Sequence, residues 1–160
     1  MPNLAKKLKK QAKKGEIIMK IAIASDKKGF ALKEHIKKYL TEKGLELLDL
    51  TEEPAKDFVD SAEKVSRLVL AGQAERGIMF DAFGAPSALA SNKIHGMVTA
   101  NVREERTAHM TTEHNGAKAI AIGAELVGKR LAESLVDTYL GVEYAAGRHQ
   151  IRLDMLEKLY

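Results

Sequence analysis

The sequence predicts an α/β fold, a three-layer α/β/α sandwich built on a five-stranded parallel, Rossmann-like sheet. Short apolar runs alternate with longer amphipathic segments along the 160-residue chain, and this alternation is typical of βαβ units. The apolar runs are nearly continuous, as in strands that helices cover on both faces. We therefore expect one domain with a flavodoxin-like arrangement and a substantial core.

The strands are predicted where the apolar runs lie. The first run, Lys20 to Ser25, is followed by polar residues and Gly29, and the fifth is ended by Gly123. Small or polar residues after an apolar run mark the point where a strand ends in a loop. The expected strands cover residues 20–25, 45–50, 77–81, 97–101 and 118–122.

The helices are predicted between these runs from apolar residues at helical spacing. In the first of them Leu32, Ile36 and Leu40 share one face, lysines are placed on the opposite face, and Gly44 is the expected C-cap. The same reasoning gives helices over residues 30–43, 59–71, 86–93, 104–112, 125–140 and 150–159.

Residues 1–18 differ in composition from the rest of the chain. They hold six lysines and one glutamate, a net charge of +5; since the whole chain carries +4, residues 19–160 come to about −1. The basic character therefore belongs to this leader. We expect a disordered tail or an upstream extension ahead of a start at Met19, and a domain over residues 19–160. A role in binding nucleic acid or membrane is disfavoured.

Composition excludes several classes of protein. The chain has no cysteine, so it has no disulfide and no thiol nucleophile of its own. It has no apolar run of about 18 residues that could span a membrane. A reducing cytoplasm is the expected location.

Two carboxylates follow predicted strands, at the edge of a parallel sheet where ligands bind. Asp26 follows the first strand in a loop without a nucleotide-binding glycine pattern. One interpretation makes it a turn or helix-cap residue, and the other makes it a residue of the site. Asp81 follows the third strand and precedes Phe83 and Gly84. It is a general base or a cap for the helix that begins near Pro86.

A histidine and an amide stand together before the fifth strand. His114 and Asn115 suit proton transfer and hydroxyl recognition, although a lone histidine there is more often a polar loop residue. His35, His95 and His109 have no such neighbours, and we interpret them as structural or surface residues.

Two arginines mark a candidate anion site. Arg148 and Arg152 are four residues apart at the start of the last predicted helix, with His149 beside them, so the two guanidiniums share a face near a helix N-terminus. Phosphate or carboxylate recognition is one interpretation. The other is a solvated pair, or salt bridges to Asp154 and Glu157.

Taken together in this order, these segments resemble the family of ribose-5-phosphate isomerase B and galactose-6-phosphate isomerase. The resemblance covers nearly all of residues 19–160. The residues that carry it are Ser25-Asp26, His114-Asn115 with Ala117 before Ala121-Ile122-Gly123, and Gly147-Arg148-His149 with Arg152.

The chain departs from the family's pattern in one loop. Active members carry Cys-Gly-Thr-Gly after the third strand, where the Cys moves the proton between C1 and C2 and the Thr helps to open the sugar ring. Here Asp81 and Phe83 stand at those positions and only Gly84 remains. Lys27 replaces a family histidine and Thr112 a family arginine. The resemblance thus implies that Asp26, Asp81, Phe83 and Gly84 form a degenerate half-site.

The loop and residues 148–156 are similar to one of the two related subunits of galactose-6-phosphate isomerase; the other, homologous subunit keeps the catalytic Cys and Thr. The resemblance implies a heterodimer or heterotetramer that interconverts galactose 6-phosphate and tagatose 6-phosphate in lactose and galactose catabolism. His114 would be the catalytic acid–base, and Asn115, Arg148, His149 and Arg152 would bind the substrate, without metal or cofactor.

Two alternatives stay open at this point. One is a self-sufficient sugar-phosphate isomerase that uses Asp81 as its base, which requires burial to raise the pKa of the carboxyl group. The other is a non-catalytic sugar-phosphate binding protein with the same fold.

Overall fold

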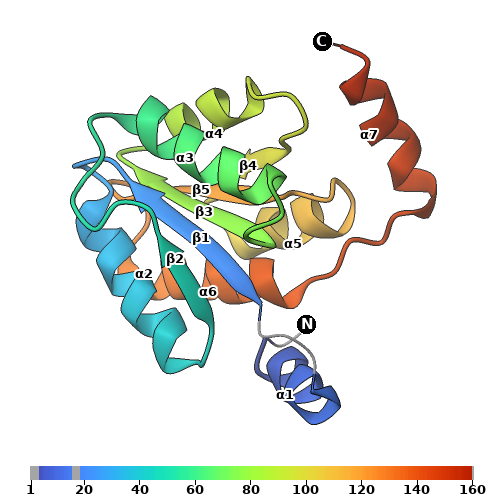
Figure 1. The fold of residues 1–160 in the computed structure, drawn as a ribbon, viewed down its shortest axis with the longest axis horizontal. Coiled ribbons are helices and arrows are strands. Elements are labelled where there is room, and N and C mark those ends of the chain that lie inside the picture. The colour runs from blue at the N-terminus through green and yellow to red at the C-terminus, as the bar shows by residue number, and fades with distance from the viewer. Residues whose placement is uncertain (1–3, 16–18, 160) are drawn as a thin grey trace.

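A computed structural model describes residues 4–15 and 19–159 and confirms the predicted sandwich. A five-stranded parallel sheet lies between layers of helices (Figure 1). The strands are β1 (Lys20–Ser25), β2 (Glu46–Asp49), β3 (Arg76–Asp81), β4 (Thr99–Asn101) and β5 (Ala119–Gly123). The helices are α1 (Leu4–Lys14), α2 (Phe30–Glu42), α3 (Phe58–Leu70), α4 (Ala85–Asn92), α5 (Glu105–Glu113), α6 (Lys129–Gly141), the short η1 (Gly147–His149) and α7 (Gln150–Glu157). In the described ranges, no helix has both the length and the hydropathy for a membrane span.

The strand order is β2-β1-β3-β5-β4. A flavodoxin-like sheet has the order 2-1-3-4-5. The predicted flavodoxin-like strand order is therefore wrong at one edge, where β5 lies between β3 and β4. The pairing of Gly77 with Ala119 and of Asp81 with Gly123 puts β3 and β5 side by side along their full length. The loops that follow β1, β3 and β5 therefore meet at one end of the sheet.

The two faces of the sheet carry side chains of different size. Isoleucines and Phe80 face α2, α5 and α6, whereas alanines and Met79 face α3 and α4. Small side chains let α3 approach the sheet closely. At Gly77 a Cβ atom would lie 2.4 Å from Val65 Cγ1, which is too close for any side chain. The sequence alternation in β1 and β5 thus sets the spacing of the layers.

The start of α6 differs from its prediction. The apolar spacing predicts residues 125–128 in the helix, but they form a turn and a short extended stretch, and α6 begins at Lys129. The N–H groups of Ala124 and Glu125 donate instead to the carbonyls of Asp81 and Ala82, at 2.8 and 2.9 Å. The turn therefore ties the β5–α6 loop to the β3–α4 loop before the helix starts.

One lysine that is predicted on the solvent face of α2 is buried. Lys33 is 0% exposed, and its Nζ donates to both oxygens of Asp49 at 3.0 and 2.9 Å and to the carbonyl of Thr51 at 2.5 Å. A buried ammonium is tolerated only with such partners. The apolar spacing of the helix could not indicate them, because Asp49 and Thr51 lie at the end of β2.

The expectation of a disordered leader is wrong for residues 4–14, which form α1. Leu4 is 2% exposed and belongs to the main core cluster, against which Leu8 also packs. Lys7 Nζ donates to the carbonyl of Leu140 at the end of α6 (3.2 Å). Burial of Leu4 and partial burial of Leu8, four residues apart on one face, explain why this segment is helical. The division of the chain at residue 18 stays a prediction, and residues 16–18 lie outside the described part.

The chain ends in an arm that stands beside the sandwich. In Figure 1, α7 extends away from the sheet on the side opposite α2. The helix has no buried residue, and Ile151, Met155 and Leu156 are each at least half exposed. It ends at Glu157 rather than at the predicted residue 159.

Candidate functional site

The predicted site residues fall into two groups at opposite ends of the sheet. Asp26, Asp81, Phe83 and Gly84 follow β1 and β3, and we call them the carboxyl-end half-site. The amino-end half-site precedes β5 or follows α6, which returns the chain to the amino ends of the strands. Its members are His114, Asn115, Arg148, His149 and Arg152.

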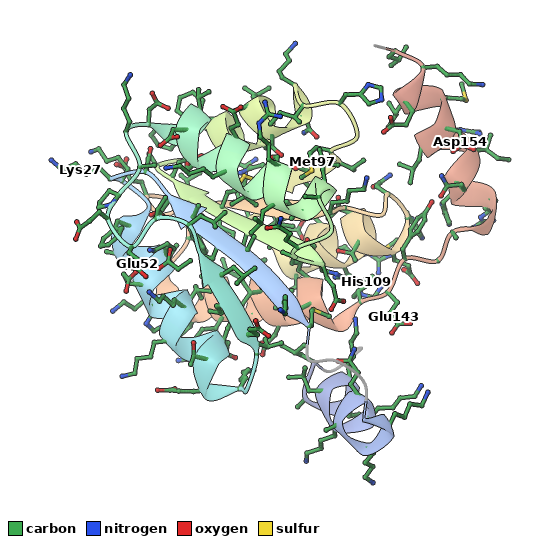
Figure 2. All side chains as sticks on the ribbon, in the orientation of Figure 1. Lys27, Glu52, Met97, His109, Glu143 and Asp154 are labelled. Carbon is green, nitrogen blue, oxygen red and sulfur yellow. The ribbon has the colours of Figure 1, made fainter. Side chains whose placement is uncertain are left out.

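The separation of the two groups follows from the parallel register. β5 holds five residues, and at about 3.3 Å per residue it separates the groups by at least roughly 15 Å. In Figure 2, Lys27, the neighbour of Asp26, lies at one edge of the molecule, and His109 and Glu143, near the amino-end half-site, lie on the other side. A hexose phosphate is too short to contact both groups in one chain.

The carboxylate of Asp81 is engaged entirely by the β3–α4 loop and the first turn of α4. Oδ1 accepts from the N–H of Phe83 at 2.8 Å and of Gly84 at 2.5 Å. Oδ2 accepts from the N–H of Ser87 at 2.8 Å and from its hydroxyl. The side chain is 1% exposed. Asp81 therefore closes the β3–α4 loop and caps the start of α4, the second of the two predicted roles.

The rest of the carboxyl-end half-site is equally self-contained. Asp26 Oδ1 accepts from the N–H of Gly29 at 3.0 Å, as a turn residue does. Gly84 has φ 77°, and a Cβ there would lie 2.0 Å from Asn101 Nδ2, so only glycine fits. The ring of Phe83 is half exposed and offers no hydroxyl where the family carries Thr.

At the other end, His114 is the C-cap of α5, and Asn115 follows it on the surface. The Nε2 atom of His114 lies 3.8 Å from Glu113 Oε2, which also pairs with His109 at 2.9 Å. The ring of His149 stacks on the ring of His114, with centroids 4.1 Å apart. The structure thus brings the two predicted histidines together although they are far apart in sequence.

Both arginines of this half-site are exposed and lack a carboxylate partner among the described residues. The alternative of salt bridges to Asp154 and Glu157 is not realised there. Asp154 Oδ1 accepts from Gln150 Nε2 at 2.8 Å, and Glu157 pairs with His95 at 3.1 Å. The pKa of His149 is lowered, mainly because its ring loses contact with water and secondly because of the nearby charges of His114 and Arg148. The arm therefore offers unneutralised positive charge beside a histidine pair.

The other histidines each pair with a carboxylate. His35 Nε2 lies 2.7 Å from Glu133 Oε1, in addition to the pairs of His95 and His109 described above. Two of them have a link to the candidate site: His109 through Glu113, and His95 through Glu157 of α7. In residues 4–15 and 19–159, no group of three or more His, Cys, Asp or Glu side chains is placed to hold a metal ion.

Sequence reasoning missed the residues that support the amino-end half-site. Glu113 accepts from the N–H of Ala145 through its carbonyl, at 2.9 Å, and Tyr144 lies in the same linker. Arg76, the first residue of β3, donates to the carbonyls of Tyr139 and Val142 at the end of α6. A cleft of about 490 Å³ beneath α7 is lined by residues that include Arg76, Tyr144 and Leu153. In the sequence, only the position of Glu113 directly before His114 could have indicated one of these supporting residues.

Comparison with known proteins identifies the family. The profile of the Ribose/Galactose Isomerase family matches residues 21–156. The chain belongs to this family. Curated relatives include the galactose-6-phosphate isomerase subunit LacA of Clostridium acetobutylicum, 48% identical over 141 residues that cover 88% of this chain and 99% of that protein. The subunit of the same name from Enterococcus faecalis is 40% identical with the same coverage.

Solved structures of the family share the fold. A ribose 5-phosphate isomerase from Thermotoga maritima is 34% identical with a TM-score of 0.85 and covers 88% of this chain and 99% of its own. The ribose-5-phosphate isomerase B of Clostridium thermocellum is 35% identical, also with a TM-score of 0.85, over 88% and 97% of the two chains. The predicted resemblance and the predicted fold class are both confirmed. The family match begins after α1, at Ile21.

Proposed function

We propose that this chain is the His- and Arg-bearing subunit of a heteromeric isomerase that interconverts galactose 6-phosphate and tagatose 6-phosphate. The observation that carries the proposal is the placement of the two half-sites at opposite ends of one sheet. A working site must then join this chain's amino-end half-site to a loop from another chain. The names of its relatives, which are subunits of galactose-6-phosphate isomerase, support that substrate and a second subunit as partner. The resemblance to the family implies that this partner is homologous and bears the catalytic Cys.

The roles of this chain's residues follow from their chemistry. His114 acts as acid–base in opening the sugar ring, with the partner's Thr, so that the ring oxygen gains a proton and the hemiacetal hydroxyl loses one. Asn115 holds a sugar hydroxyl. Arg148 and Arg152 bind the phosphate through charge-assisted hydrogen bonds, and His149 lies beside them.

The proton transfer itself uses the partner. Its thiolate removes the proton from C2 of the open-chain aldose, and the electrons move to O1 to give a cis-enediolate. The proton then returns at C1 while the proton of O2 passes to O1, so that O1 becomes a hydroxyl and O2 becomes the ketose carbonyl. Backbone N–H groups of the partner's loop stabilise the enediolate. The reaction lies in the tagatose 6-phosphate route of lactose and galactose catabolism.

The engagement of Asp81 argues against a self-sufficient enzyme. A general base needs a free lone pair aimed at the substrate, but both oxygens of Asp81 accept from the loop and from Ser87. The same N–H groups of Phe83 and Gly84 are the ones that an enediolate would require. This chain's own carboxylate occupies the place of that anion, so the carboxyl-end half-site is idle.

Mixing purified subunits tests the proposal. This chain alone should show no isomerase activity, and titration with the Cys-bearing subunit of a galactose-6-phosphate isomerase should produce activity that saturates at a fixed ratio. Activity of the chain alone would instead establish the carboxylate mechanism. Binding of the sugar phosphate without activity at any ratio would establish a non-catalytic binding protein.

A further inference from the structure

The linker between α6 and η1 is attached to the His114 loop at several points. The N–H of Ala145 donates to the carbonyl of Glu113, the residue before His114, at 2.9 Å. The hydroxyl of the preceding residue, Tyr144, donates to Gln150 Oε1 at 2.8 Å, at the start of α7. The linker thus contacts both the loop that bears the acid–base group and the helix that bears Arg152.

The ring of Tyr144 packs on Gly116, directly after Asn115. A Cβ atom at Gly116 would lie 3.3 Å from Cδ2 and Cε2 of that ring and 3.4 Å from Leu153 Cδ1 of α7. Gly116 also has φ 57°, which other residues rarely adopt. The ring and α7 therefore rest together against the backbone of the loop.

Strained backbone follows soon after Tyr144. Ala146 has φ 50° and ψ −131°, outside the regions that a residue with a Cβ normally adopts. Such a conformation persists only where its surroundings determine it on both sides. On one side lies Tyr144 against Gly116, and on the other lies the ring of His149 stacked on His114.

We infer that Tyr144 is a positioning residue that fixes the C-terminal arm, with Arg148 and Arg152, at one distance from His114. The inference rests on the proposed function. A sugar phosphate has a set length between its anomeric carbon and its phosphate group, so ring opening and phosphate binding need a set separation of the groups that perform them. α5 holds His114 in place without the linker, whereas the linker sets where the arginine-bearing arm begins. The far end of α7 is tied separately, since Glu157 pairs with His95 at 3.1 Å.

The kinetic test uses the complex of this chain with its Cys-bearing partner. Removing the ring in Tyr144→Ala should raise KM roughly 10- to 100-fold, because the phosphate-binding arginines are misplaced, while kcat changes only a few-fold. Tyr144→Phe keeps the packing on Gly116 and should restore a KM within about threefold of normal.

Tyr39→Ala is the matched control. Tyr39 is also partly buried and its hydroxyl donates to Asp137 at 2.8 Å, but it lies on α2, away from the arm. This variant should lose stability as Tyr144→Ala does and yet keep a normal KM. An unchanged KM in Tyr144→Ala, or an equal rise in Tyr39→Ala, would overturn the inference.

A second measurement on this chain alone separates this inference from the proposed function. Stacked imidazoles shift each other's C–H resonances, so NMR should show mutual ring-current shifts of His114 and His149 that disappear in Tyr144→Ala and persist in Tyr144→Phe. If the mixed wild-type subunits show no turnover, the proposed function fails but this readout still decides the role of Tyr144. Persistence of the shifts in Tyr144→Ala would contradict it.

Discussion

The two ends of the sheet differ in how they satisfy their polar groups. At the carboxyl end, Asp81 accepts all of its hydrogen bonds from its own loop and from Ser87 in the first turn of α4. At the amino end, Arg148 and Arg152 are exposed and form no ion pair within the described part of the chain. Unmet hydrogen-bonding capacity, rather than a carboxylate at a strand end, therefore marks the half-site that is free to bind a ligand in the proposed function.

The difference has an energetic basis. A buried carboxylate needs several donors to offset its loss of water, and Asp81 has four, so it gains nothing from a ligand. Exposed guanidiniums stay hydrated and can exchange water for a phosphate at a net gain of about 1.5–3 kcal/mol for each charged hydrogen bond. Substitutions at the two ends should therefore affect different properties.

The largest effect is expected at His114. In the mixed enzyme His114→Ala should lower kcat by roughly 10²–10⁴, the usual contribution of a positioned acid–base group. Steady-state rates at saturating substrate measure it. The control is His35→Ala, because His35 pairs with Glu133 far from the arm; an equal loss there would indicate a general defect.

Next in size are the arginines. Arg148→Ala or Arg152→Ala should each remove about 1.5–3 kcal/mol of charge-assisted binding, which corresponds to a KM about 10- to 100-fold higher. Melting temperatures should not change, since neither side chain is buried. Arg130→Ala, at an exposed position of α6, should leave KM as it is. Unchanged KM values in both arm variants would place the phosphate elsewhere.

At the other end of the sheet the effect should be on stability. Asp81→Ala leaves three N–H groups and a hydroxyl without their acceptor and should cost about 2–4 kcal/mol of unfolding free energy. For a chain of this size the melting temperature would fall by roughly 5–15 °C. Asp26→Ala, which loses one bond from Gly29, should cost less. Below the melting transition the mixed Asp81→Ala enzyme should turn over within a few-fold of normal.

The smallest effect concerns the charge of His149. Its pKa is lowered by loss of water and then by the charges of His114 and Arg148, so the ring should be mostly neutral at pH 7. Arg148→Ala should raise this pKa, as an NMR titration can measure. As the pH falls through the pKa, His149 gains a proton and adds positive charge to the arm. Affinity for inorganic phosphate should then strengthen; weakening over that range would contradict the assignment.

Much of the fold could be predicted because it depends on local patterns. The apolar runs predicted all five strands, and helical spacing predicted the helices that cover them. The strand order at the edge depends on long-range packing, which periodicity does not encode. The burial of Lys33 depends on Asp49 at the end of another strand, and the packing of α1 depends on a surface of α6.

The site was predictable as residues but not as an arrangement. Residue types, spacing and motif order indicated His114, Asn115 and the arginines as candidates, and His114 and Asn115 were expected just before the fifth strand. The stacking of His149 on His114 and the packing of Tyr144 on Gly116 depend on the path of the linker. That path includes a strained Ala146, which no propensity would predict.

Cross-linking in the mixed complex tests the divided site most directly. This chain has no cysteine, so an introduced Cys is its single thiol. A short bis-maleimide can then join that thiol to the catalytic Cys proposed for the partner. If the site is divided, cross-linking should be efficient from Arg152→Cys, in the amino-end half-site, and absent from Phe83→Cys, in the carboxyl-end loop. Cross-linking from Phe83→Cys but not from Arg152→Cys would contradict it.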